Sequence, residues 1–210
     1  MSEWDRILRE EWYQQEKPEE IVVSFIDLLK RQNRKMHVLD VGCGAGRHQV
    51  YMAGQGLEAH GIDISKTGLN LTRERLRRQK SPVYLVRCDM NALPYVGSCF
   101  DAVTCLHAVY HQKLEQIQRT ISEIHRTLRG KGLVLMNFLS KRTYSYGKGT
   151  EVEQDTFVER EGAEKDVLHH FAGRQEIEHL FSRFQIIDLR LAEKRVEGKL
   201  RSRWIVTART

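Results

Sequence analysis

Apolar side chains recur every three or four residues along the first thirty positions, which is the spacing of a helix with one buried face. The first predicted helix covers residues 4–14, and its apolar face consists of Trp4, Ile7, Leu8 and Trp12. Pro18 opens a second helical segment, because proline is tolerated in a first helical turn. The apolar positions of that segment are Ile21, Val22, Phe25, Ile26 and Leu29.

From Met36 onward, short apolar runs alternate with stretches of helical period. The predicted strands are residues 38–41, 59–63, 83–86, 100–106 and 133–136. The predicted helices between them are residues 46–55, 66–79 and 113–128, and the last is expected to stop at Gly130 with a left-handed cap. Strands that alternate with helices over short loops form a doubly wound α/β sheet of parallel strands.

The remaining third of the chain has a different pattern. Residues 140–168 are polar and lack a clear period. A helix near 174–181 follows, and then two strands at 184–191 and 203–208 with a turn around Gly198. A short turn predicts that these two strands pair antiparallel at an edge of the sheet.

Composition indicates one globular domain of 210 residues, with 40% hydrophobic and 30% charged residues and only 3 prolines. We divide it into a helical lid (1–33), a core (36–139), an insert that shapes the substrate site (140–173) and a C-terminal part (174–210). The first residues form no apolar segment, so neither a secretion signal nor a membrane anchor is expected. The four cysteines show no C-x-x-C spacing, and a cytoplasmic protein with reduced thiols is expected.

The formal net charge of +6 permits acidic partners. The densest basic run contains Arg73, Arg75, Arg77, Arg78 and Lys80. Because no aromatic residues are interleaved with it, a solvated helix face is favoured over a nucleic-acid surface.

A glycine-rich loop follows the first strand of the core, with the sequence Asp40-Val41-Gly42-Cys43-Gly44-Ala45-Gly46. Glycines at this junction allow a ligand to approach the backbone closely. The dinucleotide fingerprint G-x-G-x-x-G would need Gly or Ala where this chain has Arg47. The chain also lacks the phosphate loop G-x-x-x-x-G-K-[ST] of nucleotide hydrolases. If Gly147-Lys148 were the G-K of that motif, its first glycine would be at position 142, where this chain has Arg142.

The loop D-x-G-x-G-x-G at a strand end resembles the first motif of class I methyltransferases, which use S-adenosylmethionine. The resemblance implies a Rossmann-like, mostly parallel seven-stranded sheet with helices on both faces and an antiparallel C-terminal edge strand. It also implies that the loop holds the amino-acid part of the cofactor, that Asp63 binds the ribose hydroxyls and that Asp89 accepts from the adenine amine. The cofactor-binding residues implied are Asp40, Gly42, Cys43, Gly44, Gly46, Arg47, Asp63, Ile64, Asp89, Met90, Leu106 and His107.

The methyl acceptor is expected at the carboxyl ends of the strands, where open α/β sheets bind their ligands. Tyr110 and His111 follow the fourth strand and are predicted to line the acceptor site. His169 and His170 follow the insert and either fold back over the same cleft, with His170 as a catalytic candidate, or are structural. His107 and His111 have the i, i+4 spacing of a metal pair, but no third ligand accompanies them, so no metal is expected.

These features together predict transfer of a methyl group from S-adenosylmethionine to a small molecule by in-line displacement. The chain is similar to small-molecule enzymes of the tellurite-resistance and methyltransferase type 11 kind, in Gly42–His48, in His169-His170-Phe171 and in Arg203-Trp204-Ile205-Val206. Trp4, Trp12 and Tyr13 are expected to close over the cofactor. No membrane is expected, and the protein is expected to be a monomer or a homodimer. Two alternatives stay open, an RNA or protein methyltransferase and a non-catalytic partner subunit that binds the cofactor.

Overall fold

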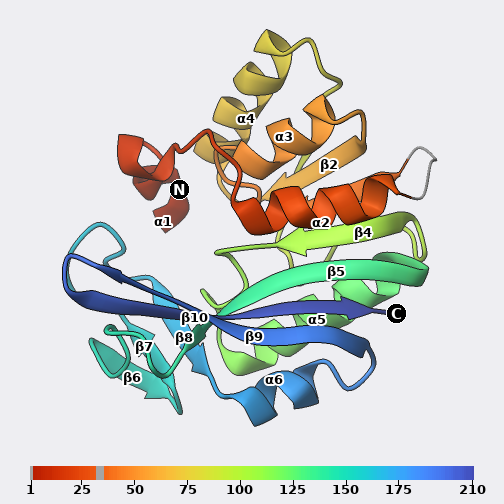
Figure 1. Ribbon diagram of the computed structural model, residues 1–210. Helices are drawn as coiled ribbons and strands as arrows, with labels where there is room; N and C mark the ends of the chain where they lie inside the picture. Colours follow the sequence, from red (N-terminus) through yellow and green to blue (C-terminus); the bar gives the residue numbers. More distant parts are fainter. Residues whose placement is uncertain (1, 32–35) are drawn as a thin grey trace.

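Seven strands of a ten-stranded sheet form the centre of the molecule (Figure 1), which we describe from a computed structural model covering residues 2–31 and 36–210. These strands lie in the order β3 (Tyr84–Arg87), β2 (Glu58–Asp63), β1 (His37–Val41), β4 (Phe100–Cys105), β5 (Leu128–Ser140), β10 (Lys199–Arg209) and β9 (Gln185–Val196). The first five strands are parallel to one another. The C-terminal hairpin closes the sheet as predicted, with β10 antiparallel to both of its neighbours and β9 at the edge.

Helices cover both faces of this sheet. On one face lie α2 (Glu20–Lys30), α3 (Arg47–Gly54) and α4 (Lys66–Arg78), and on the other lie α5 (Leu114–Thr127) and α6 (Arg174–Leu180). Each face of the sheet has its own hydrophobic core, because successive side chains of β1 point to opposite faces. Val38 packs under α2 and α3 on one face, and Leu39 packs against α5 on the other. No helix within residues 2–31 or 36–210 is long and apolar enough to cross a bilayer.

The junction of α5 and β5 differs from the sequence prediction. The helix ends at Thr127, and β5 begins directly at Leu128. Gly130 does not adopt the left-handed conformation; Lys131 has φ +67° instead. The first residues of β5 pair with Phe100 before a shift in register, so the strand runs from 128 to 140 rather than from 133 to 136.

The N-terminal segment forms α1 (Glu3–Ile7) and a single 3-10 turn, η1 (Glu11–Tyr13), instead of one helix over 4–14. Ser2 and Asp5 form a capping box at the start of α1. The same Asp5 is buried and accepts hydrogen bonds from Ser65 Oγ (2.8 Å) and from Thr67 N–H (3.0 Å) at the start of α4. This contact attaches α1 to the core.

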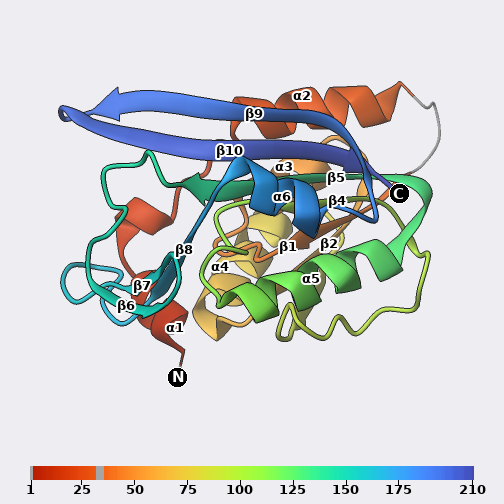
Figure 2. The same cartoon turned by 90° about the horizontal axis from the view of Figure 1, so that it is seen from below.

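The predicted irregular insert contains three strands that the sequence pattern did not reveal. They are β6 (Thr150–Glu153), β7 (Thr156–Val158) and β8 (Leu168–Ala172), which pair antiparallel in sequence order. β8 also pairs with Leu139 and Ser140 at the far end of β5. Because Leu139 pairs with β10 on its other side, β8 takes the edge of β5 that β4 has left free (Figure 2).

Replacement of Asp5 by alanine should release the N-terminal segment. The change leaves Ser65 Oγ and Thr67 N–H without their acceptor, which costs about 1–3 kcal/mol. We expect faster amide hydrogen exchange in residues 2–14, with exchange in the sheet unchanged. Glu3→Ala, in an exposed position of the same helix, is the control. Equal exchange in both variants would show that Asp5 does not hold α1.

Candidate functional site

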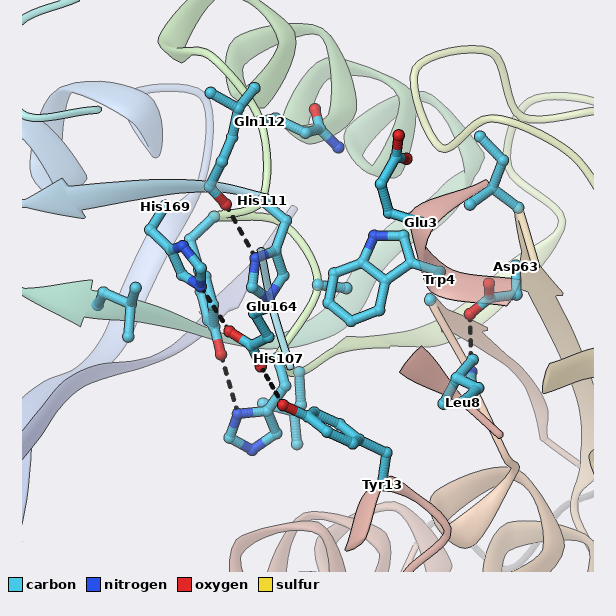
Figure 3. A pocket seen from close by; sticks show the side chains of 18 of the residues that line it. Glu3, Trp4, Leu8, Tyr13, Asp63, His107, His111, Gln112, Glu164 and His169 are labelled. Carbon is cyan, nitrogen blue, oxygen red and sulfur yellow. Dashed lines mark hydrogen bonds and ion pairs between the residues drawn. The ribbon is translucent and has the colours of Figure 1, made fainter. Parts of the chain in front are cut away.

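A cavity of about 910 Å³ opens at the carboxyl ends of β1, β2 and β4. Its floor is the glycine loop after β1, and its walls include the loop after β4. The N-terminal segment and the turn after β7 form two further sides (Figure 3). The position is the one in which open α/β sheets bind their ligands.

The glycine loop depends on residues without a Cβ. Gly42 has φ +73°, and a Cβ there would lie 2.4 Å from the Cβ of Ala108. Gly46, with φ +87°, is the residue before α3, and a Cβ there would lie 2.6 Å from Thr72 Oγ1. Both the conformation and the packing therefore require glycine at these two positions.

Asp63, at the end of β2, fixes the loop from the side. Its two carboxylate oxygens accept hydrogen bonds from Gly44 N–H (2.8 Å) and Ser65 N–H (2.7 Å). Burial raises the pKa of Asp63 although these hydrogen bonds oppose the shift. The carboxylate lies at the cavity wall, where it has unused lone pairs for ligand hydroxyls.

Asp40 lies beneath the loop and does not line the cavity. One carboxylate oxygen accepts from Thr104 Oγ1 (2.8 Å), and the other is buried without a partner among the described residues. Burial raises the pKa of Asp40 to about 7. A cation bound above the loop would stabilise its ionised form.

A chain of polar side chains crosses the cavity from α2 to β4. Glu19, the residue before α2, contacts both Arg47 and the Nε2 atom of His107. The Nδ1 atom of His107 lies 3.1 Å from the hydroxyl of Tyr110. Burial would raise the pKa of Glu19, but His107 and Arg47 lower it to about 2. Because Glu19 only accepts, His107 donates through Nε2 and accepts the Tyr110 hydroxyl proton through Nδ1.

His111 occupies an aromatic cluster in the same cavity. Its ring lies 4.7 Å from Trp4, 4.5 Å from Tyr110 and 4.9 Å from His169, measured between centroids. Nδ1 donates to the carbonyl of Leu168 (3.0 Å), so Nε2 carries the free lone pair. Burial and His169 lower the pKa of His111 to about 3, which keeps the ring neutral at physiological pH.

The N-terminal segment is connected to the turn after β7 across the cavity (Figure 3). Glu164 accepts from the hydroxyl of Tyr13 (3.1 Å) and pairs with His169 Nε2 (2.6 Å). Arg6 donates to the carbonyls of Ala163 and Lys165. These contacts enclose the space in front of His111, and sequence reasoning missed Glu19 and Glu164, which no motif marks.

His170 points away from this cavity, although it was expected beside His111. Its ring is buried, with Nδ1 at 2.7 Å from Thr156 Oγ1 and Nε2 at 2.6 Å from Glu176. Neighbouring residues of a strand point to opposite sides, so only His169 of the pair faces the cavity. All the other predicted site residues except Asp40 line the cavity, among them Ile64, Asp89, Met90 and Leu106.

Comparison with known proteins agrees with this geometry. Residues 38–132, which contain the glycine loop and Asp63, match the family described as "Methyltransferase domain". Residues 38–132 therefore have the sequence features of a methyltransferase domain. A ubiquinone biosynthesis O-methyltransferase from Thiobacillus denitrificans is 34% identical over 111 residues, which are 52% of this chain and 47% of that protein.

Solved structures of methyltransferases share the fold of this chain. A SAM-dependent methyltransferase from Methanosarcina mazei has a TM-score of 0.73 at 21% identity, over 84% of this chain and 92% of that one. TehB from Haemophilus influenzae has a TM-score of 0.70 at 14% identity, over 94% and 64%. The chain spans about half the length of the curated relatives it matches.

S-adenosylmethionine is the cofactor of class I methyltransferases, and the cavity contains residues that fit it. Gly42 and Gly46 leave the loop free of side chains for close approach. Asp63 offers a carboxylate to vicinal hydroxyls. The unpartnered oxygen of Asp40 suits a cationic ligand above the loop, because S-adenosylmethionine has ammonium and sulfonium charges.

We expect His170→Ala to lower stability without changing the site. Glu176 and Thr156 lose a buried partner, which costs about 1–3 kcal/mol of unfolding free energy. Thermal denaturation should detect this cost, and calorimetric affinity for S-adenosylhomocysteine should stay within a few-fold. His179→Ala, exposed on α6, is the control for loss of an imidazole. Normal stability with lost turnover would instead place His170 in the reaction.

Proposed function

We propose that this chain transfers the methyl group of S-adenosylmethionine to a small-molecule acceptor by in-line displacement. The observation that carries the proposal is the common cavity of the glycine loop, the Asp63 carboxylate and the polar groups of Tyr110 and His111. One end of this cavity has the groups that suit the cofactor. The other end has groups that can orient an acceptor and take its proton.

The bound cofactor supplies an electrophilic methyl group on a sulfonium. The chain contributes alignment, which accounts for much of the catalysis in a displacement of this kind. Trp4 and Tyr13 line the cavity, and the hydrogen bond between Tyr13 and Glu164 connects the N-terminal segment to the turn after β7. Exclusion of water favours transfer because it strengthens every electrostatic interaction inside the site.

Two groups can take a proton from an alcohol or amine acceptor. His111 presents an unprotonated Nε2, because Nδ1 donates to Leu168. Tyr110 can pass a proton to His107, whose other nitrogen contacts Glu19. An acceptor that is already anionic would need neither of them.

A small acceptor is favoured over RNA or protein by two observations. Residues 2–13 and 159–169 narrow the acceptor end of the cavity, because Arg6 connects the two segments by hydrogen bonds. The basic run on α4 is not wholly a solvated face, because Arg75 donates to the carbonyls of Gln15 and Ala45 and so attaches the N-terminal segment to the core. A relative named as an O-methyltransferase of ubiquinone biosynthesis supports the same choice.

The proposal is tested with methyl-labelled S-adenosylmethionine and a panel of phenols, carboxylates, thiols, amines and metalloid oxyanions. Mass spectrometry should find one labelled small molecule and an equal amount of S-adenosylhomocysteine. Label in added RNA or protein would support the first alternative. Tight cofactor binding with no labelled product in any class would support a non-catalytic subunit.

Asp63→Ala should weaken cofactor binding by roughly tenfold to a few hundredfold, because one or two charge-assisted hydrogen bonds of about 1.5–3 kcal/mol each are lost. Titration calorimetry with S-adenosylhomocysteine measures this effect. Asp188→Ala is the control, since it removes a half-exposed carboxylate that pairs only with Arg190 among the described residues. An unchanged affinity in folded Asp63→Ala would remove the ribose assignment.

His111→Ala should lower the single-turnover rate by about 10²–10⁴-fold if the ring takes the acceptor proton. Cofactor affinity should stay within a few-fold. Because the pKa of His111 is about 3, this group stays unprotonated as the pH falls. The wild-type rate should therefore show no decrease due to His111 between about pH 8 and about pH 5.

His37→Ala, at the start of β1, controls for general effects of losing a histidine. A normal rate in His111→Ala together with a slow Tyr110→Phe variant would move the proton-accepting role to Tyr110. A decrease in rate near pH 6.5 that disappears in His111→Ala would contradict the low pKa.

A further inference from the structure

The C-terminal hairpin places three cations on one side of the cavity. Arg201 and Arg203 are alternate residues of β10, so their side chains share one face of the sheet. Lys194 lies opposite Arg201 in the pairing of β9 with β10. All three line the cavity.

Along β10, the residues on this face change from apolar to basic. Ile205, two residues after Arg203, packs in the core beneath α2. The hairpin extends beyond the end of α2, and there the face carries Arg203 and Arg201 instead of apolar residues (Figure 2). Burial against a helix therefore cannot explain these two arginines.

Arg203 has no carboxylate within ion-pair distance among the described residues. Its Nε is buried and makes no hydrogen bond. The central carboxylates of the cavity are already engaged, Glu19 with Arg47 and His107, and Glu164 with Tyr13 and His169. Tyr110 is a hydrogen-bond partner of the half-buried Arg203 side chain, but its hydroxyl is neutral and does not balance the charge of the guanidinium. A cation in a cavity that lacks a carboxylate partner indicates a site for an anion.

The position of Arg203 relates it to the acceptor end of the cavity. Burial raises the pKa of Tyr110 to about 12, and the nearby charge of Arg203 opposes this shift. The charge of Arg203 also acts on His107. Arg203 therefore lies close to the hydroxyl that is connected to Glu19 through His107.

We propose that the methyl acceptor carries an anionic group, a carboxylate or a phosphate, which Arg203 binds while Arg201 and Lys194 attract it electrostatically. This inference rests on the proposed function, because it names the class of acceptor for the same site. A guanidinium offers two parallel donors to a planar carboxylate or to phosphate oxygens. An anion bound there directs the rest of a small acceptor toward Tyr110 and His111.

Binding to the complex with S-adenosylhomocysteine tests the inference without knowledge of the natural acceptor. The probes are benzoate, phenyl phosphate and the neutral benzamide, titrated by calorimetry into protein saturated with S-adenosylhomocysteine. We expect at least one of the two anions to bind and benzamide to bind at least tenfold more weakly. Comparison of benzoate with phenyl phosphate distinguishes a carboxylate site from a phosphate site.

Arg203→Gln should weaken binding of the preferred anion by at least tenfold, and Arg203→Lys, which keeps the charge without the planar fork, should retain part of it. Arg209→Gln is the matched control, because it removes the same charge from the same face of β10 outside the cavity. Thermal denaturation verifies that each variant is folded. Should Arg203→Gln not fold, a threefold or greater loss of anion affinity in Arg203→Lys, with benzamide binding unchanged, carries the same conclusion, and no loss overturns it.

The affinity of Arg203→Gln for S-adenosylhomocysteine is measured first and should stay within a few-fold of the wild type. A large loss at that step would assign Arg203 to the carboxylate of the cofactor and overturn the inference. Equal binding of anions and benzamide, no anion binding, or anion binding unchanged in Arg203→Gln would also overturn it. Failure of the wild type to bind S-adenosylhomocysteine would instead contradict the proposed function.

Discussion

The carboxylate of Asp63 is the contact on which the arrangement of the site depends. It accepts one backbone N–H from the glycine loop and another from the start of α4. The hydroxyl of Ser65 then donates to Asp5, so the same short chain continues into α1. One half-buried acidic side chain thereby fixes the floor of the cavity and, through Ser65, the segment beside it.

This arrangement has an energetic reason. A buried carboxylate is costly unless several donors surround it, and the loop supplies donors because its glycines turn the backbone toward Asp63. Asp40 lacks such donors on one oxygen, and its pKa rises to about 7. Two aspartates at neighbouring strand ends therefore differ, one held by backbone donors at the cavity wall and one buried with an unpartnered oxygen beneath the loop.

The acceptor end is built differently from the cofactor end. It combines the loop after β4 with the N-terminal segment, the turn after β7 and the C-terminal hairpin, all brought together by side-chain contacts. The extension of β5 beyond β4 makes this possible, because its free edge receives β8 and so places His169 and Leu168 beside His111. The cofactor end, in contrast, is made from consecutive strand ends of one parallel sheet.

Much of the core could be predicted from the sequence, because its signals are local. Apolar period identified the strands and helices between residues 36 and 139, and a glycine that must adopt positive φ is visible in the motif itself. The glycine loop was found in this way, and the resemblance to class I methyltransferases then pointed to Asp63 at the end of β2 and to Asp89 shortly after β3. The three strands of the insert were missed because short, polar strands have weak periodicity.

The tertiary structure alone decided which distant side chains meet. Glu19 and His107 are 88 residues apart, and Tyr13 and Glu164 are 151 residues apart, so no spacing in the chain relates them. It also decided between His169 and His170, because a strand alternates its faces and only the pairing of β8 determines which face meets the cavity. The unpartnered Nε atom of Arg203 has the same origin, since the sequence shows a cation but only packing shows which groups reach it.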